Sequence, residues 1–285
     1  KFFDTLCHKK LKATWKKILN KDSLPADHLA IYKSLTKSSS VNRDSLFEAF
    51  SISQSNPRNE GRTRVCTPLE FREKVRSGNL IKTNNSNKGI TQGTAISALL
   101  SNLYMLDFDS VMHEFVKKNN GKYMRYCDDM LLIMPSGNGK LAEDVALENI
   151  QILQLEINKE KTDRSEFYIS SGEIHSSKPL QYLGFLFDGK NIIIRSAAFA
   201  KYSNRFKRGV SLAKKTMRKR NELKSDNGAK ETDLYRKKLY SRYSHLGQRN
   251  FIRYGHRAAK IMKSTAIKKQ LRPLWNRLIK EINSE

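Results

Sequence analysis

The sequence predicts an α+β body over residues 1–195, followed by a basic, all-helical region over residues 196–285. Segments with helical spacing and strand-type runs both occur before residue 195. The last of these runs flank "DGK", a strong hairpin signal. After residue 195 the patterns indicate helices alone, with one break near "SDNGAK". We therefore expect a mixed domain leading into a helical one.

The first half of the body is predicted to be mainly helical. Residues 4–19 place Leu, Trp and Leu side chains at helical intervals. A short helix near residues 44–52 lies between two loops, and Thr67 is an N-cap candidate with Pro68 at the first helical position. Residues 77–93, rich in Gly, Asn and Ser, are expected to form an extended functional loop.

The second half combines one long helix with hairpins. Residues 94–117 are predicted as a single helix whose apolar face carries Ile96, Leu99, Leu100, Leu103, Leu106 and Val111. Residues 122–134 favour a hairpin with two aspartates at its turn, followed by a helix over residues 141–157. The runs "LQYLGFLF" and "NIIIR" are predicted to be two further strands.

Charge narrows the class of partner. The 285 residues carry a formal charge of +26, and residues 190–285 hold 27 of the 54 basic residues but 6 of the 28 acidic ones. Such an excess is expected of a surface that follows a phosphate backbone. A solvated face or an anionic-membrane contact is the alternative. Apolar runs are too short to cross a membrane, so we expect no membrane partner.

The three cysteines indicate the compartment. Cys7, Cys66 and Cys127 form no CxxC pair and are odd in number, so neither a disulfide scaffold nor a zinc knuckle is expected. This usage is typical of a reducing compartment, and we expect the protein to be cytoplasmic.

Two adjacent carboxylates, Asp128 and Asp129, interrupt the apolar stretch "KYMRYCDDMLLIM". Neighbouring anions beside apolar surface need a positive partner. At a tight bend their oxygens can face one point, which suits Mg²⁺ bound together with a nucleotide. Two such ions can clamp the attacking and leaving oxygens of a phosphoryl transfer. A merely solvated turn is the alternative.

Several segments in order resemble the sequence blocks of reverse transcriptases. These are "KFFDTLCH", "GITQGTAISALLSNLY", "YCDD", "INKEKT" and "QYLGFLF", spread over residues 1–187. The resemblance implies a right-hand polymerase palm over residues 1–195 with an antiparallel sheet, and a helical thumb over residues 196–285. Most of the fingers region would be missing from this chain.

The resemblance also implies roles for individual residues. Asp128 and Asp129 match the catalytic, metal-binding carboxylates, which would hold two Mg²⁺ ions. Nucleotide-binding positions are matched by Phe3, Gln92, Gly93 and Lys161. Phe3 would exclude a ribose 2′-hydroxyl, and Lys161 would lie near the triphosphate. Leu183 and Gly184 match the primer grip. Gln92 as a helix cap and Lys161 as a surface lysine remain alternatives.

The chain departs from the family pattern in two respects. Thr91 and Ala98 stand where the family usually has proline, which loosens the backbone without removing a reactive group. The third metal-binding aspartate is expected just upstream of Lys1, so we expect the 285 residues alone to be inactive.

The basic region is predicted to contact nucleic acid. Its basic residues are interleaved with aromatic ones that can stack on unpaired bases or form the core of a helical bundle. The candidate nucleic-acid-binding residues are Arg236, Lys237, Lys238, Arg242, Arg249, Arg253 and Arg257.

The leading hypothesis is thus an RNA-directed DNA polymerase using dNTPs, an RNA template and a DNA product. The segment "ISALLSNLYMLDFD" and the tail look most like bacterial defence-associated, anti-phage reverse transcriptases, which implies a dedicated non-coding RNA and a partner polymerase or homo-oligomer. A group II intron or retron enzyme, an RNA-dependent RNA polymerase and a non-catalytic RNA-binding scaffold are the alternatives.

Overall fold

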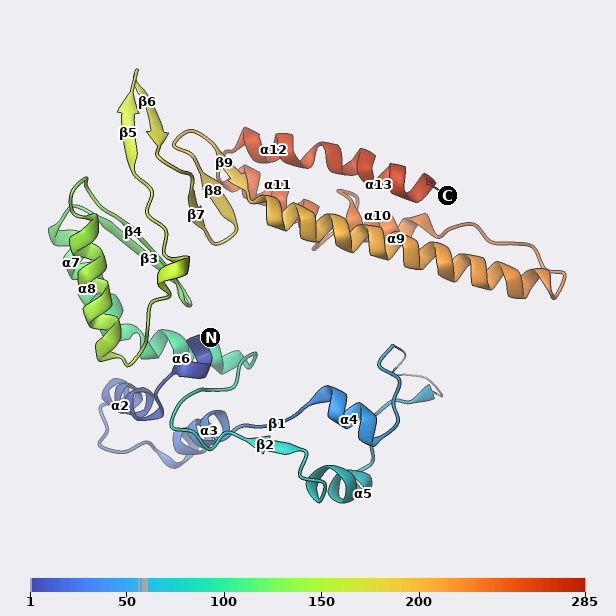
Figure 1. Cartoon of the computed structure of the whole chain (residues 1–285), viewed down its shortest axis with the longest axis horizontal. Coiled ribbons are helices and arrows are strands. Elements are labelled where there is room, and N and C mark those ends of the chain that lie inside the picture. Colours follow the sequence, from blue (N-terminus) through green and yellow to red (C-terminus); the bar gives the residue numbers. More distant parts are fainter. Residues whose placement is uncertain (1, 56, 58–60, 285) are drawn as a thin grey trace. The chain divides into compact units, whose positions relative to one another are not determined.

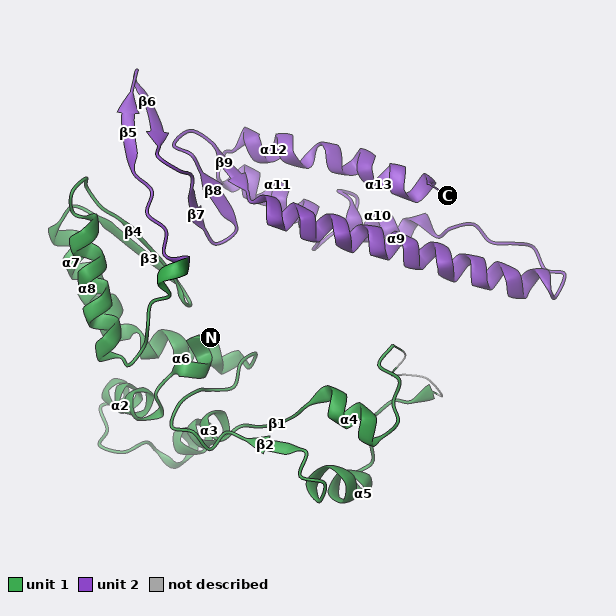
Figure 2. Ribbon diagram, in the orientation of Figure 1, with its two compact units in different colours: residues 1–160 green, residues 161–285 purple. Residues whose placement is uncertain are grey.

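A computed structural model describes residues 2–55, 57 and 61–284 of the chain (Figure 1). The chain forms two compact units, residues 1–160 and residues 161–285 (Figure 2). Each contains helices and small antiparallel sheets, so the predicted α+β composition is found. The predicted boundary near residue 195 is a different division, and it stays a prediction.

The N-terminal part of unit 1 is helical, with a two-stranded ribbon. Its helices and strands are α1 (Phe2–Thr5), α2 (His8–Leu19), α3 (Ala26–Thr36), β1 (Ser39–Val41), α4 (Arg43–Ala49), α5 (Pro68–Glu70), a π-helix (Phe71–Arg76) and β2 (Ile81–Thr83). Strands β1 and β2 are antiparallel, and Ser39 pairs with Thr83. As predicted, Thr67 caps α5: its hydroxyl accepts a hydrogen bond from the Glu70 amide, and the Glu70 carboxylate accepts one from the Thr67 amide.

The remainder of unit 1 holds the hairpin with the paired aspartates. Its elements are α6 (Ala95–Tyr104), α7 (Leu106–Lys118), β3 (Lys122–Tyr126), β4 (Asp129–Ile133) and α8 (Gly139–Ile152). The hairpin β3–β4 is antiparallel over five residue pairs. The core joins α2, α6, α7, α8 and this hairpin through buried residues that include Leu11, Leu100, Tyr104, Met112 and Tyr123.

The single helix predicted over residues 94–117 is in fact two helices that meet at Met105. The buried face also differs from the predicted one, because Leu99 is 62% exposed and Leu106 is 45% exposed, whereas Ser97 and Ser101 are buried. Ser97 and Ser101 satisfy their hydroxyls by donating to the carbonyls of Thr91 and Ala98. Small, internally bonded serines therefore let α6 pack closely, which apolar spacing alone does not reveal.

The strands of unit 2 form two small sheets. They are β5 (Phe167–Ser170), β6 (Glu173–Ser176), β7 (Leu180–Tyr182), β8 (Phe185–Phe187) and β9 (Ile192–Ile194), after a 3₁₀ turn at Lys159–Lys161. Strands β5 and β6 form one hairpin, and β7–β8–β9 form a three-stranded antiparallel sheet. The run "LQYLGFLF", predicted as one strand, is divided into β7 and β8 by a turn at Leu183 and Gly184.

Helices make up the rest of unit 2. They are α9 (Ser196–Ser225), α10 (Arg236–Tyr243), α11 (Phe251–Ile261), α12 (Thr265–Leu271) and α13 (Pro273–Asn283). They pack around a core that includes Phe206, Leu239, Ile267 and Leu278 and that extends to Ile194 of β9. Buried residues of α9 lie in its first half, between Tyr202 and Val210. None of the described helices combines the length and apolar character required to cross a membrane.

Candidate active site

Asp128 and Asp129 lie at the end of the β3–β4 hairpin. Tyr126 and Asp129 are paired, so Cys127 and Asp128 form a two-residue turn between the strands. Cys127 has a φ of 54°, in the left-handed region that disfavours a residue with a Cβ. Backbone strain of this kind persists only where neighbouring contacts hold it.

Arg125 of β3 provides such contacts beneath the turn. Its Nη1 donates to the Cys127 carbonyl at 2.8 Å and to Asn102 Oδ1 of α6 at 3.2 Å. Its Nε donates to Asp109 Oδ1 of α7 at 2.8 Å, and Nη2 pairs with the other carboxylate oxygen. The side chains of Arg125 and Asp109 are 7% and 21% exposed. A nearly buried ion pair therefore links the turn to two helices.

Tyr123 completes this network. Its hydroxyl donates to Asp109 Oδ1 at 2.6 Å. Burial raises the pKa of Tyr123, and the neighbouring Asp109 carboxylate raises it further, so the phenol stays a donor. The hydrogen bonds with Asp109 raise the pKa of Arg125 in the same way. Sequence reasoning missed these residues. Strand alternation places Tyr123 and Arg125 on the same face of β3, but it does not identify Asp109 as their partner.

The two carboxylates themselves face solvent. Both Asp128 and Asp129 are exposed, and neither side chain has a hydrogen-bond or ion-pair partner within the described residues. Paired hard oxygen donors suit Mg²⁺, which commonly takes one or two carboxylates and fills its other positions with water and phosphate oxygens. Within residues 2–55, 57 and 61–284 there is no cluster of three His, Cys, Asp or Glu side chains that could bind a metal without such additional ligands.

The loop that contains Gln92 and Gly93 is pinned to the first residues of the chain. The Gly89 amide donates to the Leu6 carbonyl at 2.8 Å, and the Ile90 amide donates to the Phe3 carbonyl at 2.9 Å. His8 Nε2 lies 2.6 Å from the Gly89 carbonyl oxygen. These contacts bring two of the predicted sequence blocks together, although more than 80 residues separate them.

Gln92 is not a helix cap. Its Nε2 donates to Asp4 Oδ1 at 3.0 Å, and the N-cap position of α6 belongs to Thr94. Gly93 has a φ of 84°, and no atom lies within 4 Å of the place where a Cβ would be. Phe3 is half-buried, with its ring edge-on to Phe2. The predicted nucleotide-binding positions Phe3, Gln92 and Gly93 thus lie on two chain segments that are hydrogen-bonded to each other.

Helix α6 connects this loop with the aspartate hairpin. It begins directly after Gly93 and Thr94, and Asn102 in its last turn accepts the hydrogen bond from Arg125. Ten residues of α-helix span about 15 Å, so both groups are attached to one rigid element of unit 1.

The other predicted site residues lie in unit 2. Lys161 is exposed, with no partner for its ammonium group among the described residues. Leu183 and Gly184 form the two-residue turn between β7 and β8, and Leu183 rather than Gly184 has the left-handed backbone, with a φ of 56°. The β5–β6 turn at Ser171 and Gly172 also begins with a non-glycine residue at positive φ, so this backbone is not specific to the predicted site turns.

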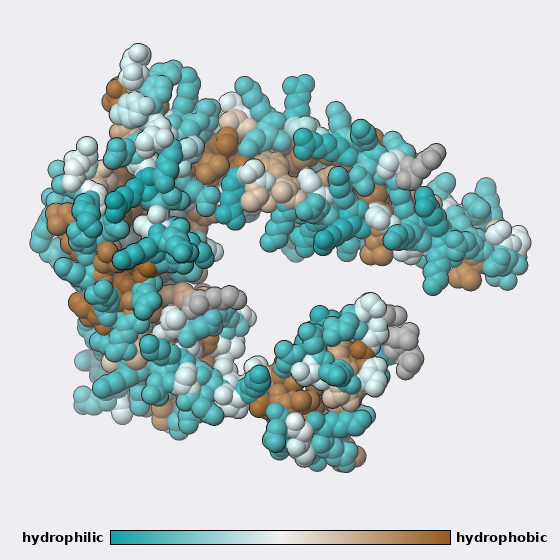
Figure 3. All heavy atoms as spheres, in the orientation of Figure 1, coloured by the Kyte–Doolittle hydropathy of each residue, from teal (hydrophilic) through white to brown (hydrophobic). Residues whose placement is uncertain are grey.

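All seven basic residues predicted to bind nucleic acid are exposed on or beside α10 and α11. Hydrophilic residues dominate the visible face of the unit 2 helices (Figure 3). The interleaved aromatic residues divide between the two predicted roles. Tyr243 is buried, Tyr240 and Phe251 pack against the core, and Tyr235 and Tyr254 are 66% and 43% exposed.

Comparison with protein families matches residues 42–187 to reverse transcriptase (RNA-dependent DNA polymerase). This match spans half of the chain and includes the Gln92–Gly93 loop, the aspartate hairpin, Lys161 and the β7–β8 turn. The chain belongs to the reverse transcriptase family. Phe3 lies outside the matched residues. No curated protein matches the chain.

Membership in the reverse transcriptase family implies a nucleotidyltransferase that copies RNA into DNA from dNTPs, generally with Mg²⁺. The positions of the predicted residues in this reverse transcriptase fall into two groups. Phe3, Gln92, Gly93, Asp128 and Asp129 lie in unit 1, whereas Lys161, Leu183, Gly184 and the basic residues lie in unit 2.

Proposed function

We propose that this reverse transcriptase is an active RNA-directed DNA polymerase whose catalytic residues are Asp128 and Asp129. One observation carries the proposal: two adjacent, exposed carboxylates lie at a strained turn that a nearly buried arginine holds in place. The Arg125 contact to the Cys127 carbonyl fixes the backbone from which both carboxylates project, which suits a metal site.

Each residue of the site has a proposed role. Asp128 and Asp129 hold two Mg²⁺ ions, which would supply charge stabilisation for the in-line displacement at the phosphate. Gln92 offers both a donor and an acceptor to the nascent base pair, with its amide oriented by Asp4. Phe3 selects deoxynucleotides by shape, and Lys161 stabilises negative charge on the departing pyrophosphate.

The rest of the chain would hold the nucleic acid. We propose that residues 1–195 form the palm, with Leu183 and Gly184 supporting the primer end. Residues 196–285 form the thumb, whose seven exposed basic residues contact phosphates. The proposed setting is bacterial antiviral defence in the cytoplasm, with a dedicated non-coding RNA as template. The α6–α7 sequence and the basic tail resemble those of bacterial defence-associated reverse transcriptases, and this resemblance supports the proposed setting.

A non-catalytic RNA-binding scaffold is the second candidate. The absence of a third clustered carboxylate within the described residues favours it. The unpaired state of Asp128 and Asp129 argues against it, because two uncompensated adjacent anions have no use in a protein that binds RNA, itself an anion.

A primer-extension assay distinguishes an active polymerase from a non-catalytic RNA-binding scaffold. The protein would be purified as the natural full-length chain with its bound RNA, then supplied with Mg²⁺ and labelled dNTPs or rNTPs. We expect incorporation of dNTPs by the wild type and none by an Asp128→Asn/Asp129→Asn variant. Asp144→Asn, at a partly exposed aspartate of α8 that pairs with Lys140, is the control and should retain activity.

Two results would contradict the proposed RNA-directed DNA polymerase activity. If neither the wild type nor the variant incorporates nucleotide while both retain RNA at moderate salt, the scaffold is the better description. Preferential incorporation of rNTPs would indicate an RNA-dependent RNA polymerase.

A further inference from the structure

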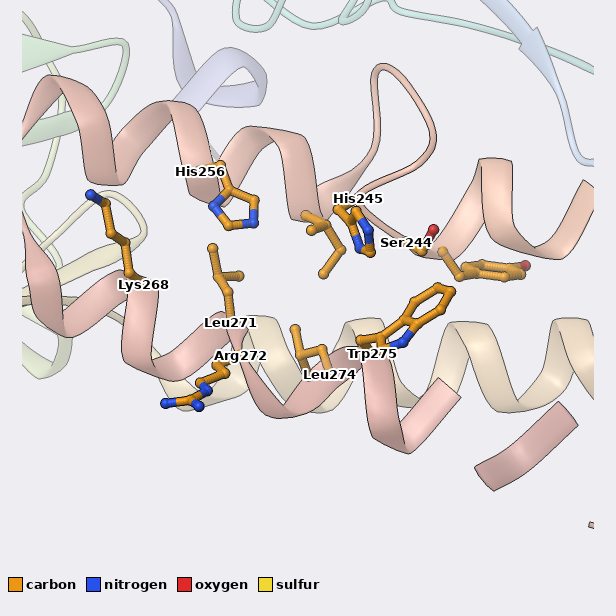
Figure 4. Close-up of a pocket in the computed structure, with 10 residues that line it drawn as sticks. Ser244, His245, His256, Lys268, Leu271, Arg272, Leu274 and Trp275 are labelled. Carbon is orange, nitrogen blue, oxygen red and sulfur yellow. The ribbon is translucent and has the colours of Figure 1, made fainter. Parts of the chain in front are cut away.

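The helical part of unit 2 contains a cavity of about 300 Å³ that the proposed polymerase chemistry does not use. Residues of α11, α12 and α13 line it, together with the segment directly after α10. Its floor is apolar, formed by Ile252, Leu271 and Leu274. In Figure 4 the imidazoles of His245 and His256 lie on one side, with Trp275 next to His245 and Lys268 beyond His256.

The polar groups around this cavity are donors or groups that can become donors. The side chains of His245, His256, Lys268 and Trp275 have no hydrogen-bond or ion-pair partner in the part of the chain that the structure describes. Four unpartnered groups of this type around one cavity leave their hydrogen-bonding capacity to solvent or to a ligand. The ligand that satisfies them must present acceptor atoms.

Charge indicates what kind of acceptor this is. None of the described residues that line the cavity is acidic, whereas Lys268 and Arg272 are cationic. Figure 4 shows the Arg272 side chain extending away from the two imidazoles, so Lys268 is the cation that we assign to the ligand. Desolvation lowers the pKa of His256, and the nearby His245, Arg253 and Lys268 lower it further. A bound anion would offset this cationic field.

The aromatic side chains indicate the rest of the ligand. Trp275 lies 5.0 Å from the His245 ring and 5.4 Å from the Tyr240 ring, measured between centroids. Trp275 is half-buried, so part of its indole remains accessible beside the apolar floor. A planar group can pack against such a surface, and base–aromatic contacts of this type are common in proteins that bind single-stranded nucleic acid.

We propose that this cavity binds a nucleoside phosphate, with the base against Trp275 and the apolar floor and the phosphate at Lys268 and His256. Its ligand is either a free nucleotide or one unpaired nucleotide of a bound strand. The proposal goes beyond polymerase activity. It does not involve Asp128 or Asp129, so each can fail while the other holds.

The two tryptophans of the chain make a direct test possible. Trp15 is buried in unit 1 and donates to His28 Nδ1, whereas Trp275 lines the cavity. Wild-type protein labelled with 5-fluorotryptophan gives two ¹⁹F signals, which a Trp275→Phe variant assigns. The ligands are AMP, adenosine, inorganic phosphate and an oligoadenylate of five nucleotides. We expect AMP and the oligonucleotide to shift the Trp275 signal in a saturable way, while the Trp15 signal stays in place.

Matched variants test the phosphate contact. Lys268 and Lys269 are adjacent exposed lysines of α12, but only Lys268 lines the cavity. We expect Lys268→Ala to weaken AMP binding about tenfold, the usual effect of losing a charge-assisted hydrogen bond. Lys269→Ala should leave AMP affinity unchanged. His256→Ala should also weaken AMP binding, because His256 lines the cavity.

Comparison of the ligands shows whether the bound nucleotide comes from a strand or is free, and it also defines the results that would overturn the proposal. Tighter binding of the oligonucleotide than of AMP would identify a strand as the source, and the reverse would identify a free nucleotide. Three results would overturn the proposal: no shift of the Trp275 signal with any nucleotide, equal effects of AMP and adenosine, or equal losses in the Lys268→Ala and Lys269→Ala variants.

Discussion

Arg125 is the residue on which the geometry of the aspartate turn depends most directly. It contacts the Cys127 carbonyl, Asn102 and Asp109 at once, so it joins one strand to two helices. Holding Cys127 in the left-handed region costs about 1 to 2 kcal/mol, and the hydrogen bond to its carbonyl helps to offset that cost. Removing either member of the ion pair leaves an uncompensated charge in a nearly buried position.

Asp109→Asn tests this support. We expect the variant to lower the free energy of unfolding by about 3 kcal/mol, because the Arg125 guanidinium loses its charged partner. Urea unfolding followed by circular dichroism measures the change. The same variant should lose polymerase activity at temperatures where it is still folded, since the turn loses its anchor.

Glu114→Gln on the same helix is the control for Asp109→Asn. Glu114 pairs with Lys118 on the exposed surface of α7, and solvent screens such pairs strongly. We expect no measurable change in stability or activity. A loss as large as that of Asp109→Asn would show that any charge change on α7 has this effect, and that the network beneath the turn is not special.

A substitution at Gly93 tests whether the backbone at this position requires glycine. Its φ of 84° is one that a residue with a Cβ adopts at a cost of about 1 to 2 kcal/mol, although open space surrounds the position. We expect Gly93→Ala to lower the free energy of unfolding by about that amount in urea titrations. Gly139, in the same unit, has ordinary φ and equally open surroundings. Gly139→Ala should therefore be neutral or slightly stabilising, and a comparable loss there would contradict the backbone explanation.

At the scale of elements, sequence patterns predicted the presence of hairpins and helices better than the positions at which one helix ends and the next begins. The aspartate hairpin and the cap at Thr67 follow from local rules, and the family match supports the order of the blocks. The break at Met105 was not predicted, because it depends on how Tyr104 and Phe108 enter one core. The Asp4–Gln92 and Arg125–Asp109 contacts were missed for a related reason. They join residues distant in sequence, and no local pattern encodes such a pairing.

Tyr104 shows how α6 is tied into unit 1. It is 1% exposed, its hydroxyl donates to the Leu153 carbonyl at 2.5 Å, and it accepts a hydrogen bond from the Cys7 amide at 3.2 Å. Burial raises the pKa of Tyr104 to about 12. The unfolded chain therefore releases this proton first as pH rises. The contribution of the neutral phenol to stability is complete below about pH 10 and is lost as pH approaches 12.

Tyr104→Phe makes that pH dependence measurable. At neutral pH we expect the variant to lose about 1 to 3 kcal/mol of unfolding free energy, because the Cys7 amide and the Leu153 carbonyl lose their partner. The difference between wild type and variant should narrow by about 2 to 3 kcal/mol between pH 10 and 12. Urea unfolding at fixed pH values measures it. A constant difference across this range would mean that Tyr104 does not titrate with the proposed shift.

At the scale of the whole molecule, charge is divided unevenly between the two units. Residues 161–285 contain 30 basic and 10 acidic residues, whereas residues 1–160 contain 24 and 18. Composition alone predicted a polyanionic partner for the basic region. It did not predict which basic side chains are free of acidic partners, because that depends on how the helices pack. In the described part of the helical region, residues 196–284, no basic side chain pairs with an acidic one.

The salt dependence of RNA binding tests whether this free charge contacts phosphates. If all seven candidates from Arg236 to Arg257 neutralise a phosphate of a single strand, the logarithm of the affinity should fall with the logarithm of the salt concentration with a slope of about −5. Arg242→Gln should reduce the steepness by about 0.7. Lys117→Gln, an exposed site of α7 in unit 1, should leave the slope unchanged. Fluorescence anisotropy with a labelled RNA across a range of KCl concentrations measures the slope. A shallow slope in the wild type, or equal changes in both variants, would show that the basic helices of unit 2 are only a solvated surface.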